Sequence, residues 1–188
     1  MSKSLIFVKN NEIVHSAYIV AESIRTNIIS SNIAKEAFKN DTTQECILLD
    51  SNVNTIGESA FENCSEIQIV MFSENKELKN EKETELAVSK TLSIHYQAFK
   101  NCYKLHTIVL PKMSKHKKIK IEKEAFLGCK ELRTIVIPEG RAKIAEEAFI
   151  GCDTEKIVFV IFNQNNNCIV AKYAREHGFR YIVADPIK

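Results

Sequence analysis

The side chains that could do chemistry are six cysteines and five histidines. Cys102 comes closest to a reactive arrangement, because His106 follows it by four residues and His95 precedes it by seven. A thiol beside an imidazole can serve as a nucleophile with its base, or as part of a metal site. The five glycines form no phosphate-binding loop, and no His-Glu-x-x-His motif occurs. We therefore expect no enzymatic activity, no cofactor and no metal ion.

Most of the cysteines follow a repeated dipeptide rather than a reactive motif. Ala-Phe occurs five times, with its aromatic residues at Phe38, Phe61, Phe99, Phe126 and Phe149. Three residues after the last four stand Cys64, Cys102, Cys129 and Cys152. A cysteine that recurs at one position of a repeat is most simply a small buried apolar side chain. Sulfurs stacked in a line also do not surround one metal ion, so the structural interpretation of Cys102 is favoured.

The spacing of the phenylalanines defines a repeat. They lie 23, 38, 27 and 23 residues apart, which is one 23-residue unit with insertions of 15 and 4 residues. Five residues before each Phe stand Ile33, Ile56, Ile94, Ile121 and Ile144. Apolar runs such as 107–110 and 134–137 predict short strands, and the stretch ending in Ala-Phe predicts one helical turn. A unit this short cannot bury its own apolar face, so we expect the units to stack with parallel strands.

Two of the units resemble a known family. Residues 94–111 (IHYQAFKNCYKLHTIVLP) and 121–138 (IEKEAFLGCKELRTIVIP) are similar to BspA-like, or Treponema pallidum-type, leucine-rich repeats. The resemblance covers about residues 28–162 and implies an α/β-type right-handed solenoid with short parallel strands and about five 23-residue repeats. The resemblance implies a surface or secreted module for adhesion and interaction. The segment 171–182 is similar to the capping helix and strand that close such arrays.

Three parts of the chain follow from this pattern. They are an N-terminal cap (1–27), the repeats (28–162) and a C-terminal cap of helix and strand (163–188). The apolar runs Leu5–Val8 and Ile13–Val20 predict a hairpin that covers the first repeat, because an uncapped solenoid exposes its core. Apolar residues at helical spacing within 169–174 predict the closing helix, with Gly178 as its stop.

The two insertions differ in charge. Residues 73–90 mix Glu and Lys and predict either a solvated loop or short helix, or a partner-specific contact. The second insertion coincides with a basic loop whose lysines are Lys112, Lys115, Lys117, Lys118 and Lys120. This loop is either simply solvated or binds an acidic protein surface or another acidic polymer. It has no Arg and no aromatic residue, so nucleic acid is not an expected partner.

The outward side of the predicted strands is unusually apolar. Because side chains alternate along a strand, the positions ten and eight residues after each Phe should face outward. Those that we expect to bind a partner are Leu48, Met71, Val109, Val136, Phe159, Ile69, Thr107, Thr134 and Ile157. Soluble monomers rarely leave such a stripe uncovered, so we predict that it contacts a partner protein. The alternatives are that a loop or the C-terminal tail folds over it, or that these residues merely suit strands.

The function expected from the sequence is therefore that of a non-catalytic protein–protein interaction module. An adhesin-like fragment, a scaffold and a toxin-neutralising immunity protein all fit, with a toxin, a surface protein or a second copy as partner. The alternative is a binder of glycan or acidic polymer through the basic loop 112–120. The net charge of +2 gives no general pull to nucleic acid or membranes. With no leader-like or membrane-spanning apolar run we expect a cytoplasmic location, or a surface or secreted one if the chain is a fragment or is exported by a non-standard route.

Overall fold

A computed structural model describes most of the repeat region and both flanking segments. The described residues are 3–9, 12–19, 26–29, 32–50, 53–72, 91–112, 118–162 and 168–184. Within 3–9, 12–19 and 26–28 the description covers the backbone only. None of the helices in these ranges is long and apolar enough to cross a bilayer.

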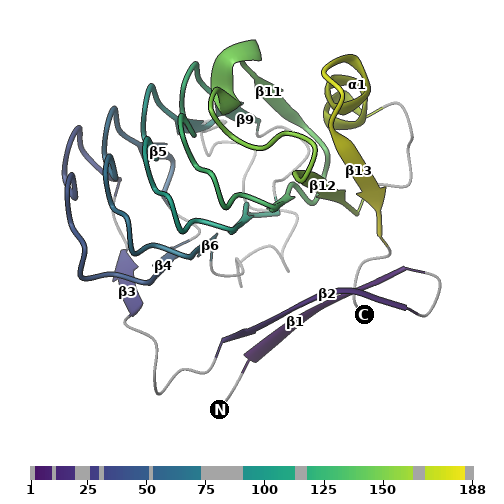
Figure 1. Cartoon of the computed structure of the whole chain (residues 1–188), viewed down its shortest axis with the longest axis horizontal. Coiled ribbons are helices and arrows are strands. Elements are labelled where there is room, and N and C mark those ends of the chain that lie inside the picture. The colour runs from purple at the N-terminus through teal and green to yellow at the C-terminus, as the bar shows by residue number, and fades with distance from the viewer. Residues whose placement is uncertain are drawn as a thin grey trace, which may run out of the picture.

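The repeats wind into a solenoid with two parallel sheets on different sides (Figure 1). The long sheet contains, in chain order, β3 (Thr26–Ile29), β4 (Cys46–Leu49), β6 (Ile69–Phe72), β8 (Thr107–Val109), β10 (Thr134–Val136), β12 (Val158–Ile161) and β13 (Arg180–Val183). The short sheet contains β5 (Thr55–Ile56), β7 (Leu92–Ile94), β9 (Ile119–Ile121) and β11 (Ala142–Ile144). The stacked, parallel-stranded solenoid expected from the repeat is thus confirmed.

A third side of each coil, the turn side, carries the Ala-Phe pairs and is not helical in most units. Residues two before the Phe have positive φ in four units (Glu36, Ser59, Gln97, Glu124), and those two after it in all five (Asn40, Asn63, Asn101, Gly128, Gly151). A left-handed residue every fourth position interrupts any α-helix. Among the described residues of the repeats, only the turn of the last unit forms a short 3-10 helix, Glu146–Phe149. The prediction of a helical turn is therefore wrong for the other four units.

Hydrogen bonds between coils replace the missing helix on the turn side. The N–H of Phe61 donates to the carbonyl of Ala98 at 2.8 Å, and that of Phe99 donates to Ala125 at 2.8 Å. The same link recurs two residues to either side of Phe61 and two residues after Phe99, so alternate N–H groups of these turns point to the next turn. These bonds give backbone groups near the core the partners that they require.

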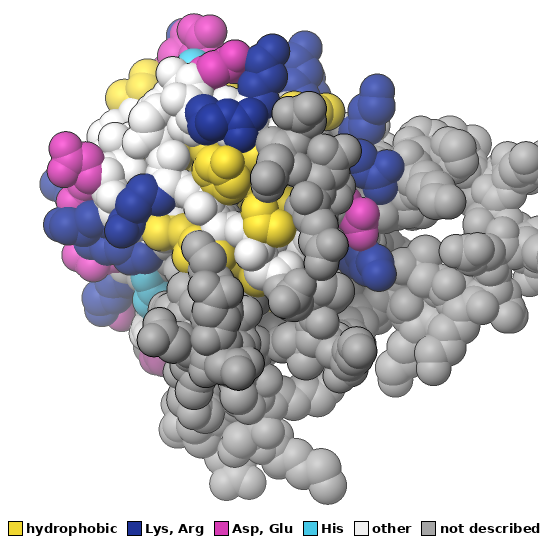
Figure 2. All heavy atoms as spheres, turned by 90° about the vertical axis from the view of Figure 1, so that its right-hand side faces the viewer, with side chains coloured by type: hydrophobic (Ala, Val, Ile, Leu, Met, Phe, Trp, Pro, Cys, Tyr) yellow, Lys and Arg dark blue, Asp and Glu magenta, His cyan; other side chains and the backbone are white. Residues whose placement is uncertain are grey.

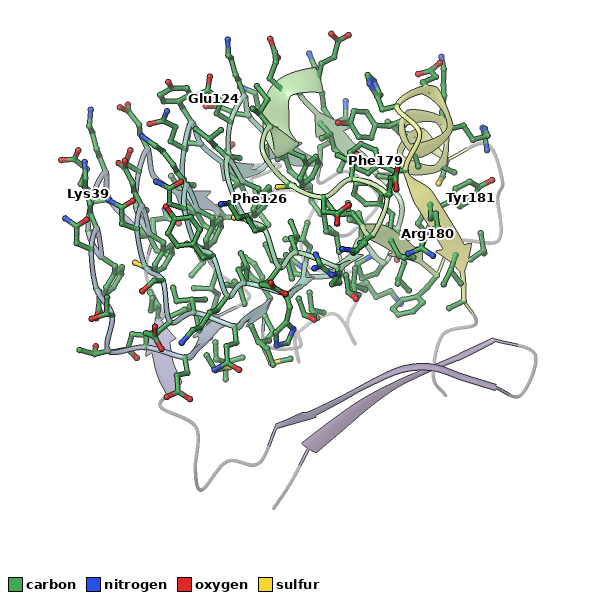
Figure 3. All side chains as sticks on the ribbon, in the orientation of Figure 1. Lys39, Glu124, Phe126, Phe179, Arg180 and Tyr181 are labelled. Atoms are coloured by element: carbon green, nitrogen blue, oxygen red, sulfur yellow. The ribbon has the colours of Figure 1, made fainter. Side chains whose placement is uncertain are left out.

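The phenylalanines form one continuous stack inside the coil. Neighbouring ring centroids from Phe38 to Phe149 lie 5.1, 5.2, 5.4 and 5.4 Å apart, with ring planes within 6° of parallel. Phe126 lies in the interior, whereas Lys39 and Glu124 project from the rim of the turn side (Figure 3). The predicted register of the five Ala-Phe pairs is confirmed by this stack.

The two ends of the solenoid are finished differently. At the C-terminal end, helix α1 (Ile169–Glu176) leads to β13, and edge-on contacts of Phe159 and Phe179 with Phe149 end the ring stack. Ahead of the repeats in the sequence, β1 (Lys3–Lys9) and β2 (Glu12–Ile19) form an antiparallel hairpin with a sheet of its own. It is β3 that extends the long sheet beyond the first repeat. The hairpin expected here exists, but it adds no strand to the first repeat.

Candidate binding surfaces

The outer face of the long sheet is apolar, as predicted, but mostly covered. Ile69, Met71, Thr107, Thr134 and Val136 are buried, whereas Leu48 and Val109 are half-buried. Val136 is fully buried in a small cluster with Val160 and Ala184, and Val109 packs against its edge. Because Val136 has no exposed area in the single chain, this end of the face is covered from within the chain. The prediction of an open apolar stripe is therefore wrong at Val136, and the alternative of an internal cover holds there.

Phe159 and Ile157 do not lie on the outer face at all. Phe159 pairs in register with Ile135 and, like Ile157, is fully buried in the main core. The strand begins five residues after Cys129 in the fourth unit but six residues after Cys152 in the fifth. This extra residue moves every side chain of β12 to the opposite face. Val160, not Phe159, occupies the outward position beside Val136.

The cysteines serve the core rather than a reaction. The Cys102 thiol donates to the carbonyl of Phe61 at 3.1 Å, and Cys64, Cys129 and Cys152 each donate to the equivalent carbonyl one coil earlier. Burial raises the pKa of the Cys102 thiol well above its usual range, which keeps it protonated. His106 contacts the hydroxyl of Thr107, and His95 contacts Glu122. Cys102 therefore has its own partner in the core, and nothing in this geometry activates it.

The described residues offer no metal-binding cluster. No group of three or more His, Cys, Asp or Glu side chains within them is arranged to hold a metal ion. The four thiols of the Cys column each point to a backbone carbonyl one coil earlier.

The outer face of the short sheet is polar and accessible. Lys120 on β9 pairs in register with Lys143 on β11, and Ser93 on β7 pairs with Lys120. The residues on either side of Lys120 and Lys143 in these strands are buried, so alternation turns both lysines outward. Two exposed lysine side chains thus project from neighbouring strands, and such strands lie about 4.8 Å apart.

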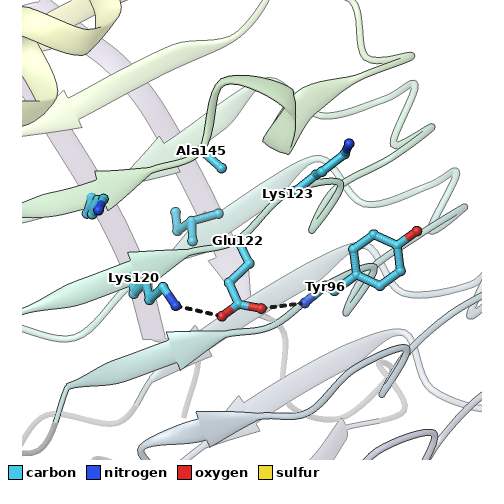
Figure 4. Close-up of a pocket in the computed structure, with 7 residues that line it drawn as sticks. Tyr96, Lys120, Glu122, Lys123 and Ala145 are labelled. Carbon is cyan, nitrogen blue, oxygen red and sulfur yellow. Dashed lines mark hydrogen bonds and ion pairs between the residues drawn. The ribbon is translucent and has the colours of Figure 1, made fainter.

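A shallow hollow of about 310 Å³ lies beside this lysine pair (Figure 4). Its lining consists of Tyr96, Lys120, Ile121, Glu122, Lys123, Lys143 and Ala145. One Glu122 oxygen accepts from Lys120 at 2.8 Å, and the other accepts from the Tyr96 backbone N–H at 3.1 Å. The second oxygen also lies 3.2 Å from the His95 ring. Glu122 is thereby fixed at one edge of the hollow.

The charge balance of the hollow is positive. Burial alone would raise the pKa of Glu122, but the Lys120 hydrogen bond and the His95 charge outweigh it and hold that pKa below its usual range. The carboxylate therefore stays charged and is shared by Lys120 and His95. Lys143 has no carboxylate partner among the residues that the structure describes. We call Lys118, Lys120, Lys123 and Lys143 the lysine face, since the last three are exposed and line this hollow and Lys118, also exposed, precedes Lys120 by two residues.

The predicted basic loop meets the lysine face only in part. Lys112 and Lys118 are exposed, and Lys120 belongs to β9. Lys115 and Lys117, like the insertion 73–90, lie outside the described residues. Sequence reasoning missed Lys143, although a signal exists. Six residues before each Phe stand Asn32, Thr55, Ser93, Lys120 and Lys143, a uniformly polar column.

The C-terminal end presents a different mixture of side chains. In the view onto this end, hydrophobic side chains show in the middle of the described surface, with Lys and Arg side chains around them (Figure 2). Ile169 on α1 is 57% exposed, whereas Tyr181 on β13 is partly covered and accepts a hydrogen bond from Arg175 at 3.0 Å. Scattered exposed hydrophobic side chains are ordinary for a protein surface, so this end is not a candidate site.

The comparisons with known proteins agree with the architecture. The family described as BspA type leucine rich repeat region (6 copies) matches residues 11–95 and 92–171. A leucine rich cell surface protein of Faecalibacterium prausnitzii, known from a crystal structure, is 24% identical with a TM-score of 0.55. The alignment covers 83% of this chain but only 38% of that one. This likeness shows the fold.

Two further comparisons add context. The leucine rich repeat protein of T. pallidum is 14% identical with a TM-score of 0.37, over 87% of both chains. A search of curated protein sequences found no match. The family match, in contrast, spans most of the sequence and coincides with the stacked coils described above. The chain belongs to the BspA-type leucine-rich repeat family.

Proposed function

We propose that the chain is a non-catalytic module that binds another protein, and that the lysine face is the surface that contacts the partner. Repeats of this family commonly mediate protein–protein interaction. The observation that carries the proposal is the register of Lys120 beside Lys143 on an exposed sheet face, next to the hollow.

The chemistry of this surface favours an acidic partner segment. Lys118 and Lys143 are exposed ammonium groups that form no ion pair within the described ranges, so an incoming carboxylate would not displace an existing partner there. Tyr96 at the rim of the hollow is 38% exposed and offers a flat amphipathic side chain. Tyrosine is enriched at protein interfaces because it buries apolar area and keeps a polar tip. An acidic segment with a neighbouring apolar side chain fits this combination.

The outer face of the long sheet is the weaker alternative for the same function. Of its predicted contact residues, Leu48 and Val109 are half-buried and all the others are buried. A partner that docked there would first have to uncover Val136, which is fully buried. The lysine face needs no such rearrangement.

The experiment captures partners from a native lysate with three forms of the chain. The first is the unaltered protein, the second is Lys118→Glu with Lys143→Glu, and the third is Leu48→Gln with Val109→Thr. We expect the charge-reversed form to lose the partner and the third form to keep it. Loss in the third form alone would return the contact to the long sheet and overturn the proposal. The double change Val109→Asp with Val136→Asp is unsuitable as a control, because Val136 is fully buried.

Salt dependence separates the two surfaces independently. Contacts between exposed charges weaken as salt rises, since the screening length falls from about 10 Å at 0.1 M to about 3 Å at 1 M. Binding through the lysine face should therefore fade over this range, whereas apolar docking should persist. The identity of the captured protein then separates an adhesin-like, a scaffold and a toxin-neutralising role.

A glycan or other acidic polymer is the second candidate, supported by the same four lysines. Dextran sulfate and a poly-glutamate peptide serve as probes for it. Binding of dextran sulfate that charge reversal abolishes, with no protein captured, would favour this candidate over the first.

A further inference from the structure

The turn side ends with an unfilled edge at its N-terminal limit. In the second turn, the carbonyls of Glu58, Ala60 and Glu62 each accept a hydrogen bond from an N–H of the first turn. The equivalent carbonyls of the first turn belong to Lys35, Ala37 and Lys39, and no backbone N–H of the described residues donates to them. The first turn therefore has the acceptors for another coil in front of it.

The side chains of the first turn are also more exposed than those of the later turns. Ala37 is exposed, whereas the alanine of every later Ala-Phe pair is fully buried. Phe38 is half-buried, and within the described residues it stacks on one ring only, that of Phe61. Each of Phe61, Phe99 and Phe126 lies between two rings. One ring face of Phe38 is left without an aromatic neighbour among these residues.

The sequence ahead of this edge contains a divergent copy of the repeat. Moving back 20 residues from the first unit, Ile33, Ala37 and Phe38 become Ile13, Ala17 and Tyr18. The same offset is observed in the sheet, where Asn27 pairs with Ile47 and Ile29 with Leu49. Ile29 is buried in the main core, as the equivalent position of every later unit is. The family match also begins at residue 11, ahead of this copy.

The segment that carries this copy is paired elsewhere in the hairpin. Residues Glu12–Ile19 form β2 and pair with β1, which places Ala17 opposite Leu5. Among the described strands this sheet has two, and an isolated two-stranded hairpin is marginal in water. The edge of the first turn offers a row of three carbonyls and an aromatic face instead. The same residues thus have two possible partners.

We propose that Ile13–Ile19 docks on the edge of the first turn as an additional coil, exchanging β1 for the solenoid. In this arrangement Tyr18 stacks on Phe38, and its N–H donates to the carbonyl of Ala37. Ile13 continues the row that the bridge between Ile33 and Ile56 begins. The occupant of the open edge is the chain's own segment. This inference does not depend on the lysine face.

Two engineered cysteine pairs distinguish the two arrangements in the full-length chain. Ala17→Cys with Ala37→Cys places the thiols on adjacent coils, and Leu5→Cys with Ala17→Cys places them opposite each other in the hairpin. Neighbouring strands lie within the Cα separation of about 4.4–6.8 Å that a disulfide needs. We expect the 17–37 disulfide to form under mild oxidation, identified by peptide mass spectrometry against the six native cysteines. Formation of the 5–17 disulfide alone, or of neither, would overturn the proposal.

A second measurement does not require a disulfide to form. In the single variant Ala37→Cys, docking should shield the new thiol from iodoacetamide. Adding Tyr18→Ala should raise its rate of alkylation several-fold, and adding Tyr18→Phe should not, because phenylalanine retains the ring that stacks on Phe38. Equal rates in all three forms would contradict docking.

Discussion

The two sheets of this solenoid turn side chains outward by the same alternation, yet their outer faces differ. Val136 on the long sheet is fully buried beside Val160 and Ala184, whereas Lys143, in the same coil on the short sheet, is exposed. Alternation fixes the side of a strand to which a residue points, but not what covers that side. An apolar outward position indicates a covered face as readily as a binding face.

The largest expected effect comes from placing the same charge on both faces. Val136→Asp buries a carboxylate among apolar side chains and should cost about 4 kcal/mol or more, or prevent folding. Lys143→Asp on the exposed face should change the free energy of unfolding by no more than about 0.5 kcal/mol. Urea unfolding of the two variants measures the difference. Equal, small losses would show that the long-sheet face is open after all.

A covered ion pair should likewise outweigh an exposed one. Glu62 on the turn side is 10% exposed and bonds Lys100 at 2.8 Å and Lys39 at 3.0 Å. Burial alone would raise its pKa, but hydrogen bonds from Lys100, Lys39 and Ser59 outweigh this and lower the pKa from 4.5 to about 2. Glu62→Gln should therefore cost up to about 3 kcal/mol at pH 7.

The pH dependence of stability checks the sign of this effect. Because the folded-state pKa lies below the ordinary value, Glu62 stabilises the fold above pH 4.5 and loses this contribution as the pH falls from 4.5 toward 2. The Gln variant should show a flatter fall in thermal midpoint over that window. As a comparison, Lys120→Gln breaks an exposed pair and should cost about 0–1 kcal/mol. A larger loss for Lys120→Gln than for Glu62→Gln would reverse the assignment.

The smallest effect concerns the half-buried part of the long-sheet face. Val109→Ala removes two methyl groups that pack against the small apolar cluster and should cost about 1 kcal/mol. Ser93→Ala on the short sheet should be within about 0.5 kcal/mol of the unaltered chain. Thermal unfolding resolves the two, and no loss for Val109→Ala would mean that this position is uncovered.

The sequence predicts the inward columns of the repeat because their spacing is fixed by the stack. The Phe rings stack on one another, and the Cys thiols each donate to a carbonyl one coil earlier. Both columns follow from the regular spacing of the Ala-Phe pairs in the sequence. The turn conformation was harder to predict. Asn and Gly are typical of left-handed residues after the Phe, but Glu36, Ser59, Gln97 and Glu124 before it are not.

The outer faces could be predicted only in part. Residues 157–161 (IVFVI) are apolar throughout, so both registers of β12 fit the pattern and one extra residue decided between them. Val136 is fully buried in a cluster with Val160 and Ala184, and the alternation of side chains along a strand does not predict that this outward position is covered. Lys120 and Lys143 share a column, but a strand of three residues is too short for alternation to be convincing.

The most direct test of the open lysine face is a lysine-acetylation footprint of the chain with and without its captured partner. We predict that labelling of Lys120 and Lys143 falls in the complex. Labelling of Lys104 and Lys156, which are 55% and 59% exposed and precede strands of the long sheet, should stay unchanged. Protection of Lys104 and Lys156 with Lys120 and Lys143 unaffected would contradict the account.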